Sequence, residues 1–439
     1  MAAWSEYAIF WHVYPLGFAG TPADGAPDAA PVPRLRRLIG WLDYARDLGC
    51  SALLLGPVFA ASTHGYDTVD YYRIDPRLGD DRDFTDLVDA ARSRGLRIVL
   101  DGVFNHVGRG FPRFARALAD GPSSAAASWF RPRAGDDGQV TYETFEGHHG
   151  LVALNHESPE VAAFTGDVMN HWLDRGASGW RLDAAYRMAP RFWARVLPGV
   201  RERHPDAWFC GEMIHGDYAG YARAAGLDSV TAYELWKAIW SSLNDGNFFE
   251  LAWALKRHDA MLDDVTPQTF VGNHDVTRLA SRLADDRHLG HALAVLCTVA
   301  GVPSVYYGDE QAFRGVKDER AGGDDAIRPA FPADPAELAP EGRPMYRLHQ
   351  RLIGFRRRHP WLLRARTEPV HLTNRAMALS ATSPGADSRV LTLLNVSDDP
   401  YRFPLEIPGP GLAESDPPAS PDDPLLVPAH GWAVLTAPA

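Results

Sequence analysis

The chain alternates between short apolar runs and longer stretches in which apolar residues recur with helical spacing. The short runs are continuously apolar, which is typical of strands buried on both faces of a parallel sheet. These predicted strands are Ile9–Tyr14, Ala52–Pro57, Arg97–Asp101, Trp180–Asp183, Trp208–Glu212, Asp228–Ala232, Thr269–Gly272 and Ser304–Tyr307. The predicted helices are Leu35–Leu48, Phe84–Arg94, Glu160–Arg175, Pro190–Arg203, Leu289–Ala300 and Met345–Arg358.

This order of strands and helices predicts an α/β fold, and the number of repeats favours a closed (β/α)8 TIM barrel over an open sheet. Residues 107–150 follow the third strand, are rich in Gly, Pro and Ser, and show no clear helix, so we expect a short inserted subdomain there. Short apolar runs separated by Pro and Asp over residues 360–439 predict a C-terminal antiparallel β sandwich. The barrel itself is then assigned to residues 1–106 and 151–359.

Composition narrows the possible partners and the compartment. The 56 acidic and 44 basic side chains give a formal net charge of −12, which argues against nucleic acid because phosphate binding needs a basic face. No apolar run approaches the roughly 20 residues of a membrane span, and no secretory signal is seen at the start, so we expect a cytoplasmic protein. Cys50, Cys210 and Cys297 are odd in number and far apart, which suits free thiols, and no paired spacing indicates zinc.

Polar residues gather where the predicted strands end. In a barrel these ends form one rim, and catalytic side chains collect there. A single Asp at a strand end is more often a cap or turn former. Here, however, the three acids Asp183, Glu212 and Asp275 share the rim with Arg181, His106 and His274, and this combination predicts an active site. The clusters are His64-Gly65-Tyr66-Asp67, Asn105-His106, Arg181-Leu182-Asp183, Gly211-Glu212 and Asn273-His274-Asp275.

Two carboxyl groups across a small gap can cleave an acetal, because one attacks carbon while the other donates a proton. The donor must stay protonated near neutral pH, and the nucleophile must stay ionised. Arg181 lies two residues before Asp183, on the same face of a strand, whereas Glu212 has no cation near it in sequence. We therefore predict Asp183 as the nucleophile and Glu212 as the acid/base.

These motifs, in this order, resemble the α-amylase superfamily of glycoside hydrolases (family 13) from about Ile9 to Arg358. The resemblance implies the same roles for Asp183 and Glu212, and it implies that Asp275 holds sugar hydroxyls and stabilises the transition state. It also implies a retaining enzyme that acts on α-glucans. The residues expected to bind substrate are His64, Tyr66, Asp67, His106, Arg181, His274 and Arg328.

Finer features indicate the subgroup. Val152-Ala153-Leu154-Asn155 and the run Gly65–Tyr71 resemble neopullulanases and cyclomaltodextrinases, which implies α-1,4-linked short maltooligosaccharides or cyclodextrins as substrates. Arg328-Pro329 resembles a pair found in enzymes that act on short oligosaccharides. In related α-glucosidases an Asp equivalent to Asp67 pairs with such an Arg and holds the terminal glucose. An ordinary surface ion pair between Asp67 and Arg328 is the alternative interpretation.

Two other functions stay open at this point. A sugar hydroxyl could intercept the glycosyl ester in place of water, which would make the chain a transglycosylase or a sucrose- or maltose-isomerising synthase. A non-catalytic sugar-binding barrel is the other alternative. No organic or redox cofactor is implied. Calcium is not supported, because Ala185-Tyr186-Arg187-Met188 follows the nucleophile where many secreted relatives carry a Lys-His pair, and a structural role is expected for Asn105. The sequence gives no prediction of oligomeric state.

Overall fold

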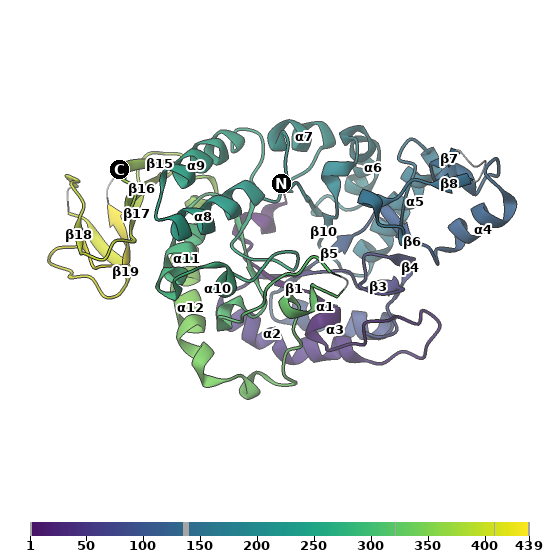
Figure 1. Ribbon diagram of the computed structural model, residues 1–439, viewed down its shortest axis with the longest axis horizontal. Helices are drawn as coiled ribbons and strands as arrows, with labels where there is room; N and C mark the ends of the chain where they lie inside the picture. The colour runs from purple at the N-terminus through teal and green to yellow at the C-terminus, as the bar shows by residue number, and fades with distance from the viewer. Residues whose placement is uncertain (1, 135–139, 321, 408, 438–439) are drawn as a thin grey trace.

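The computed structural model describes residues 2–134, 140–320, 322–407 and 409–437. At its centre, eight parallel strands form a sheet that closes on itself. Thr231 and Gln268 form a parallel bridge between the two end strands, and the Ala232 N–H donates to the Gln268 carbonyl at 2.9 Å. The predicted TIM barrel is thus confirmed (Figure 1). In spatial order the strands are β12 (Ser229–Val230), β11 (Trp208–Gly211), β10 (Gly179–Leu182), β5 (Arg97–Gly102), β2 (Ala52–Leu55), β1 (Phe10–Val13), β14 (Val302–Tyr306) and β13 (Gln268–Phe270).

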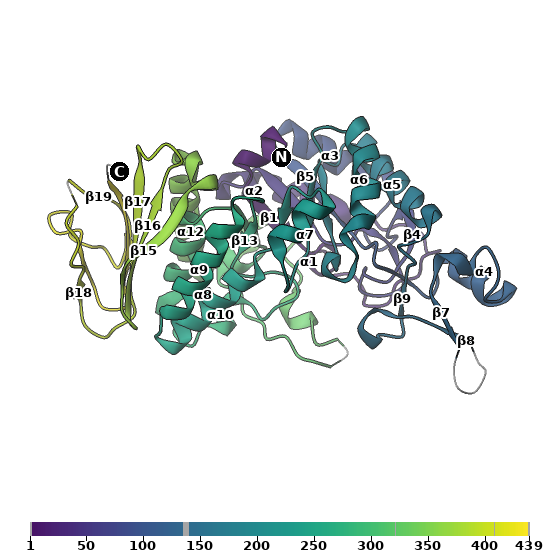
Figure 2. The same ribbon diagram turned by 90° about the horizontal axis from the view of Figure 1, so that it is seen from above.

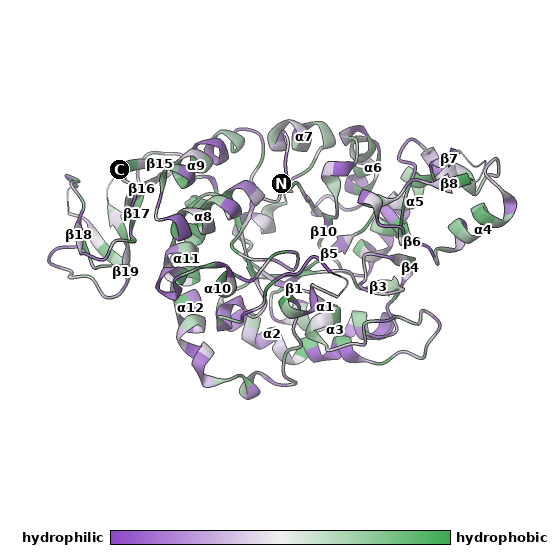
Figure 3. Ribbon diagram, viewed as in Figure 1, coloured by the Kyte–Doolittle hydropathy of each residue, from purple (hydrophilic) through white to green (hydrophobic). Residues whose placement is uncertain are grey.

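Helices cover the outside of the barrel and mix hydrophobic and hydrophilic residues along their length (Figure 3). The predicted helices are confirmed to within a few residues as α2 (Arg37–Leu48), α3 (Asp81–Ser93), α5 (Pro159–Asp174), α6 (Pro190–Arg203), α11 (Leu289–Thr298) and α12 (Arg343–Arg358). The helices that the sequence did not predict are α1 (Pro15–Phe18), α4 (Pro112–Asp120), α7 (Tyr218–Ala225), α8 (Tyr233–Asp245), α9 (Phe249–Met261) and α10 (Leu279–Arg282). No helix among these described residues is long and apolar enough to cross a membrane.

Successive side chains of a strand point to opposite faces, so the barrel has one core inside the strands and another between the strands and the helices. On β1, Trp11 points outward and packs with Trp41 of α2, and both rings are fully buried. Phe10 points into the barrel and meets Trp208 of β11 with ring centroids 5.0 Å apart. These inner rings fill the end of the barrel near the strand starts. The opposite end, where the strands finish, is left for polar side chains.

The insertion after β5 is built on a short antiparallel pair, β6 (His106–Gly108) and β9 (Leu151–Ala153). Between them lie α4 and a hairpin of β7 (Pro132–Ala134) and β8 (Val140–Tyr142). The expectation that this stretch lacks a helix is wrong. Pro112 begins α4 in a position where its missing N–H costs nothing, and Phe114 and Ala117 bury one face of the helix.

The C-terminal residues form an antiparallel sheet, as predicted. Its order is β15 (Arg366–Leu372), β16 (Ala376–Thr382), β17 (Arg389–Asn395), β21 (Trp432–Ala437) and β19 (Gly411–Asp416). One face, including Met377 and Trp432, packs against α11, and the other is covered by the paired strands β18 (Tyr401–Arg402) and β20 (Leu426–Val427). This sheet and the insertion lie at opposite ends of the molecule (Figures 1 and 2).

Candidate active site

Two of the predicted catalytic residues, Asp183 and Glu212, lie just beyond the ends of the neighbouring strands β10 and β11. The Asp183 N–H donates to the Gly102 carbonyl at 3.0 Å, and the Glu212 N–H donates to the Leu182 carbonyl at 2.9 Å. The strand ladder therefore continues through both residues and fixes their backbones. Side chains alternate along a strand, so Glu212, four residues after Trp208, points to the same inner side of the barrel as Trp208.

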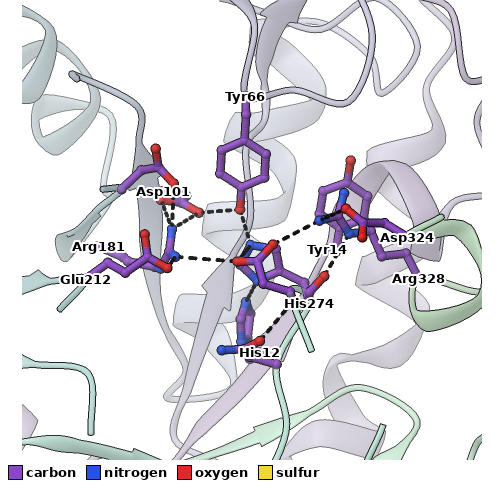
Figure 4. Close-up of polar contacts among 12 residues, drawn as sticks. His12, Tyr14, Tyr66, Asp101, Arg181, Glu212, His274, Asp324 and Arg328 are labelled. Atoms are coloured by element: carbon purple, nitrogen blue, oxygen red, sulfur yellow. Dashed lines mark hydrogen bonds and ion pairs between the residues drawn. The ribbon is translucent and has the colours of Figure 1, made fainter. Parts of the chain in front are cut away.

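Arg181 of β10 is the centre of the site (Figure 4). Its side chain is 4% exposed, and its Nη1 lies 2.7 and 2.8 Å from the two carboxylate oxygens of Asp101. Nη1 is also 3.5 Å from Asp183 Oδ1. Nη2 lies 2.6 Å from Glu212 Oε1 and 3.9 Å from Asp275 Oδ2. All three predicted catalytic acids thus surround one guanidinium group.

The sequence argument for Arg181 as a partner of Asp183 alone is wrong. Arg181 is closer to Glu212, which also accepts the Ala184 N–H at 2.8 Å. The error arises because β10 and β11 are neighbours in the barrel, and this adjacency does not appear in chain spacing. Burial, reinforced by the charge of Glu212, raises the pKa of Asp183 well above its ordinary value, and burial also raises the pKa of Glu212. The charges alone therefore do not assign the two roles.

Asp275 differs from both. Burial alone would raise its pKa, but His274 and Arg328 outweigh that effect and hold the pKa well below its ordinary value. Its Oδ2 lies 2.9 Å from His274 Nε2, and its Oδ1 accepts from Arg328 Nη2 at 3.0 Å. The side chain remains 31% exposed. Asp275 is therefore a fixed, partly exposed negative charge that can accept hydrogen bonds from hydroxyl groups.

Tyr66 and His274 form one side of the site (Figure 4). Their rings stack with centroids 5.5 Å apart and an interplanar angle of 4°. The Tyr66 hydroxyl donates to Asp101 Oδ2 at 3.0 Å and contacts His274 Nε2. On the other edge of the imidazole, His12 Nε2 of β1 lies 3.2 Å from His274 Nδ1. Tyr66 is 8% exposed, so only a small part of this residue is accessible.

His106 and His64 lie on the wall formed by the insertion and the loop after β2. Burial lowers the pKa of His106 to about 3, so the ring is neutral, and Phe145 stacks on it with centroids 4.7 Å apart. Its Nδ1 lies 3.0 Å from the Asn105 amide, whereas its Nε2 has no hydrogen-bond partner among the described residues. This contact gives Asn105 the structural role expected of it. His64 accepts the Tyr66 N–H at its Nδ1 and is exposed.

The expected pair of Asp67 and Arg328 does not match the contacts of either residue. Asp67 accepts the Thr63 N–H at 3.1 Å and the Thr63 hydroxyl at 2.8 Å, so its carboxylate closes its own turn. Arg328 instead pairs with Asp275 and, at 2.8 Å, with Asp324 four residues earlier. Its guanidinium lies over the Tyr14 ring, 4.5 Å from the centroid. Arg328 therefore orients Asp275 rather than Asp67.

Sequence reasoning did not assign four polar residues of this network. They are His12, Asp101, Tyr233 and Asp324; Tyr233 places its hydroxyl 3.4 Å from Glu212 Oε1. Two of them carried a signal. His12 and Asp101 are polar residues within buried strands, on the face that points into the barrel. A buried polar residue on a strand needs a partner, and here the partners are His274 and Arg181.

A (β/α)8 barrel with paired carboxyl groups at the carboxyl ends of its strands has the architecture of a barrel glycosidase. The family description "Alpha amylase, catalytic domain" matches residues 12–374. The chain belongs to the α-amylase family of glycoside hydrolases.

The individual relatives agree with the subgroup that the motifs predicted. A cyclomaltodextrinase of Bacillus sp is 32% identical over 342 residues, which are 72% of this chain and 61% of the relative. Neopullulanase 2 of Thermoactinomyces vulgaris is 30% identical over 93% of this chain and 72% of its own length. Among solved structures, the cyclic alpha-maltosyl-(1→6)-maltose hydrolase of Arthrobacter globiformis has a TM-score of 0.81 at 27% identity and is covered over 100% of both chains. The chain thus spans about three fifths of the Bacillus enzyme but all of the Arthrobacter one.

Proposed function

We propose that the chain is a retaining α-glucoside hydrolase that cleaves α-1,4 bonds in short maltooligosaccharides or cyclodextrins by double displacement. The observation that carries this proposal is the shared guanidinium of Arg181, which holds Asp183 near one nitrogen and Glu212 against the other. Two carboxyl groups bound to one planar group lie on the same small surface. Retaining chemistry needs such closeness, with the carboxyl groups roughly 5 to 5.5 Å apart.

In the proposed first step, Glu212 gives its proton to the oxygen of the leaving sugar while Asp183 attacks the anomeric carbon. The bond to the leaving oxygen breaks, and an ester forms between the sugar and Asp183. In the second step, ionised Glu212 takes a proton from water, the water oxygen attacks the same carbon, and the ester releases Asp183. Two inversions give a product with the original α configuration. Asp275, held ionised by its two cations, accepts hydrogen bonds from the sugar hydroxyls.

The substrate class is supported by the named relatives, which include a cyclomaltodextrinase, a neopullulanase and a hydrolase of cyclic maltosyl-maltose. We infer a preference for short or cyclic α-glucans over long starch chains. Comparison of turnover on maltotriose, γ-cyclodextrin, cyclic maltosyl-maltose, pullulan and soluble starch tests this inference. Starch as the best substrate would contradict it. New, longer oligosaccharides at high sugar concentration, in place of glucose and maltose, would show transglycosylation instead.

The roles of the two acids are tested by azide rescue. With α-glucosyl fluoride as substrate, Glu212→Ala should still form the ester, and azide should then give α-glucosyl azide of retained configuration. Asp183→Gly should leave room for azide to attack directly and give the β-azide. Asp67→Asn serves as the control, because Asp67 contacts Thr63 rather than the acids, and it should give free glucose and no azide product. A β-azide from Glu212→Ala would reverse the assignment, and no rescue in either variant would contradict the mechanism.

A further inference from the structure

A group of ligand-type side chains outside the active-site network lies where the barrel meets the C-terminal sheet. His288 precedes α11, His430 lies in the loop before β21, and Asp285 precedes the short 3₁₀ helix Asp286–His288. One ligand atom from each of these residues lies within 4.8 Å of the others. The two imidazoles belong to segments 142 residues apart, yet His288 Nε2 and His430 Nδ1 are separated by 3.0 Å. His288 is buried, and its two neighbours are half-buried.

A carboxylate behind His430 sets the direction of its ring. Asp398 Oδ1 lies 2.9 Å from His430 Nε2. With the Nε2 proton directed to this carboxylate, Nδ1 is unprotonated, and its lone pair accepts the Nε2–H of His288. Metal-binding histidines usually have such an outer carboxylate, which fixes the tautomer and makes the ligand nitrogen more basic. The pair therefore has both a donor nitrogen and the outer support that a metal centre uses.

The separation of the two imidazole nitrogens is close to the spacing of two ligands in a zinc site. Zinc binds imidazole nitrogen at about 2.0–2.1 Å, so two nitrogens of a tetrahedral site stand about 3.3 Å apart. The two nitrogens here are 3.0 Å apart. Metal binding would need one tautomer change, in which the proton of His288 moves from Nε2 to Nδ1, and no net proton is released. Imidazole favours zinc, nickel or copper over magnesium and calcium, which prefer oxygen ligands.

Two arginines compete for the carboxylates, and both are exposed. Arg287 Nη2 lies 2.6 Å from Asp285 Oδ2, and its side chain is 60% exposed. Arg375 Nη1 lies 3.7 Å from Asp398 Oδ2, with 61% of the side chain exposed. Arg287 Nε also lies 3.0 Å from both oxygens of Asp285, so a divalent cation must displace a bidentate guanidinium from this carboxylate. The exposure of Arg287 leaves its side chain room to swing into solvent when this happens.

We propose that Asp285, His288 and His430 bind a divalent transition-metal ion, Zn²⁺ foremost, with water completing a tetrahedral shell. The ion would join the start of α11 to the C-terminal sheet. It would have no role in the chemistry of the barrel rim.

The test is titration of the full chain, stripped of metal with EDTA, with Zn²⁺ in a calorimeter. We expect one ion per chain with a dissociation constant in the micromolar range or below. His288→Ala and His430→Ala should each weaken binding at least a hundredfold, and Asp398→Asn by tenfold to a hundredfold. His204→Ala is the matched control, because it removes a histidine that pairs with a carboxylate, Asp174, elsewhere on the surface.

Two further measurements keep the test decisive. Zn²⁺ should raise the melting temperature of the unmodified chain and of His204→Ala, but not of His288→Ala. Co²⁺ in place of Zn²⁺ should give the visible absorption of a tetrahedral site with nitrogen ligands. If His430→Ala does not fold, His430→Gln replaces it. The proposal fails if Zn²⁺ binds no better than to the double variant of His288 and His430, or if His204→Ala weakens binding as much as His288→Ala does.

Discussion

Replacement of Arg181 by Met should abolish most of the activity while leaving the barrel folded. Arg181 Nη1 lies 3.5 Å from Asp183, and at an effective dielectric constant of about 20 that separation corresponds to roughly 5 kcal/mol of attraction. Each 1.4 kcal/mol is a factor of ten in an equilibrium constant, so the acid dissociation constant of Asp183 should fall on the order of a thousandfold. Since the nucleophile acts only when ionised, kcat/KM should fall by up to this factor, and the fall should be largest at low pH.

The loss of activity in Arg181→Met should also depend on pH. Without the cation the pKa of Asp183 rises further, so the acid limb of the kcat/KM profile should move to higher pH. Arg181→Lys keeps the charge but cannot reach Asp101, Asp183 and Glu212 together, and it should retain an intermediate activity. Arg187→Met, which removes an exposed arginine after the same strand, is the control. Activity of Arg181→Met within tenfold of the unmodified chain, with an unmoved acid limb, would refute the electrostatic argument.

Three more changes test other parts of the network. His12→Ala leaves His274 Nδ1 without its buried partner, a loss of about 1–3 kcal/mol, so kcat should fall roughly tenfold to a hundredfold. His12→Gln, whose amide can still donate, should recover most of the lost activity, and equal activity of the two variants would contradict this positioning role. Arg328→Lys should lower kcat/KM about tenfold to a hundredfold, because it weakens a charged hydrogen bond to Asp275; unchanged kinetics would contradict it. Burial raises the pKa of Glu310 from 4.5 to about 7, so between these pH values the folded chain keeps a proton that the unfolded chain releases, and the free energy of unfolding should fall as pH rises. Denaturant unfolding of Glu310→Gln should show a weaker dependence of this free energy on pH over that range, and an equal dependence would contradict the prediction.

The barrel could be predicted because its strands are continuously apolar, and this pattern can be read from each strand's own sequence without knowing which strands lie beside it. The helix α4 could not, because its nine residues lie in a stretch rich in Gly and Pro, and such a stretch favours turns. The helix α9 was missed for another reason. Its exposed Phe249 and Trp253 blur the contrast between its buried and solvent faces.

The candidate site shows the same division between local and tertiary information. Its motifs are contiguous in the chain, so Asp183, Glu212 and Asp275 could be named from sequence. Contacts that join different strands could not: Arg181 reaches Glu212 across 31 positions, and His12 reaches His274 across 262. The charge argument failed at Arg181 because it counted neighbours along the chain, whereas the barrel places β10 beside β11.

The contacts of Asp101 explain how one arginine can serve two acids that must behave differently. Asp101 is fully buried and occupies Nη1 of Arg181 with both oxygens, while its second donor is the Tyr66 hydroxyl. This fixes the guanidinium so that Nη2 meets Glu212 at 2.6 Å and only a long contact of 3.5 Å is left for Asp183. A carboxylate with few short hydrogen bonds keeps its lone pairs free for carbon. The two donors to Glu212 fix its position but favour its ionised form, so burial, which raises its pKa, must supply the protonated state. In the proposed mechanism, unequal hydrogen bonding therefore frees Asp183 to attack, and burial keeps the proton on Glu212.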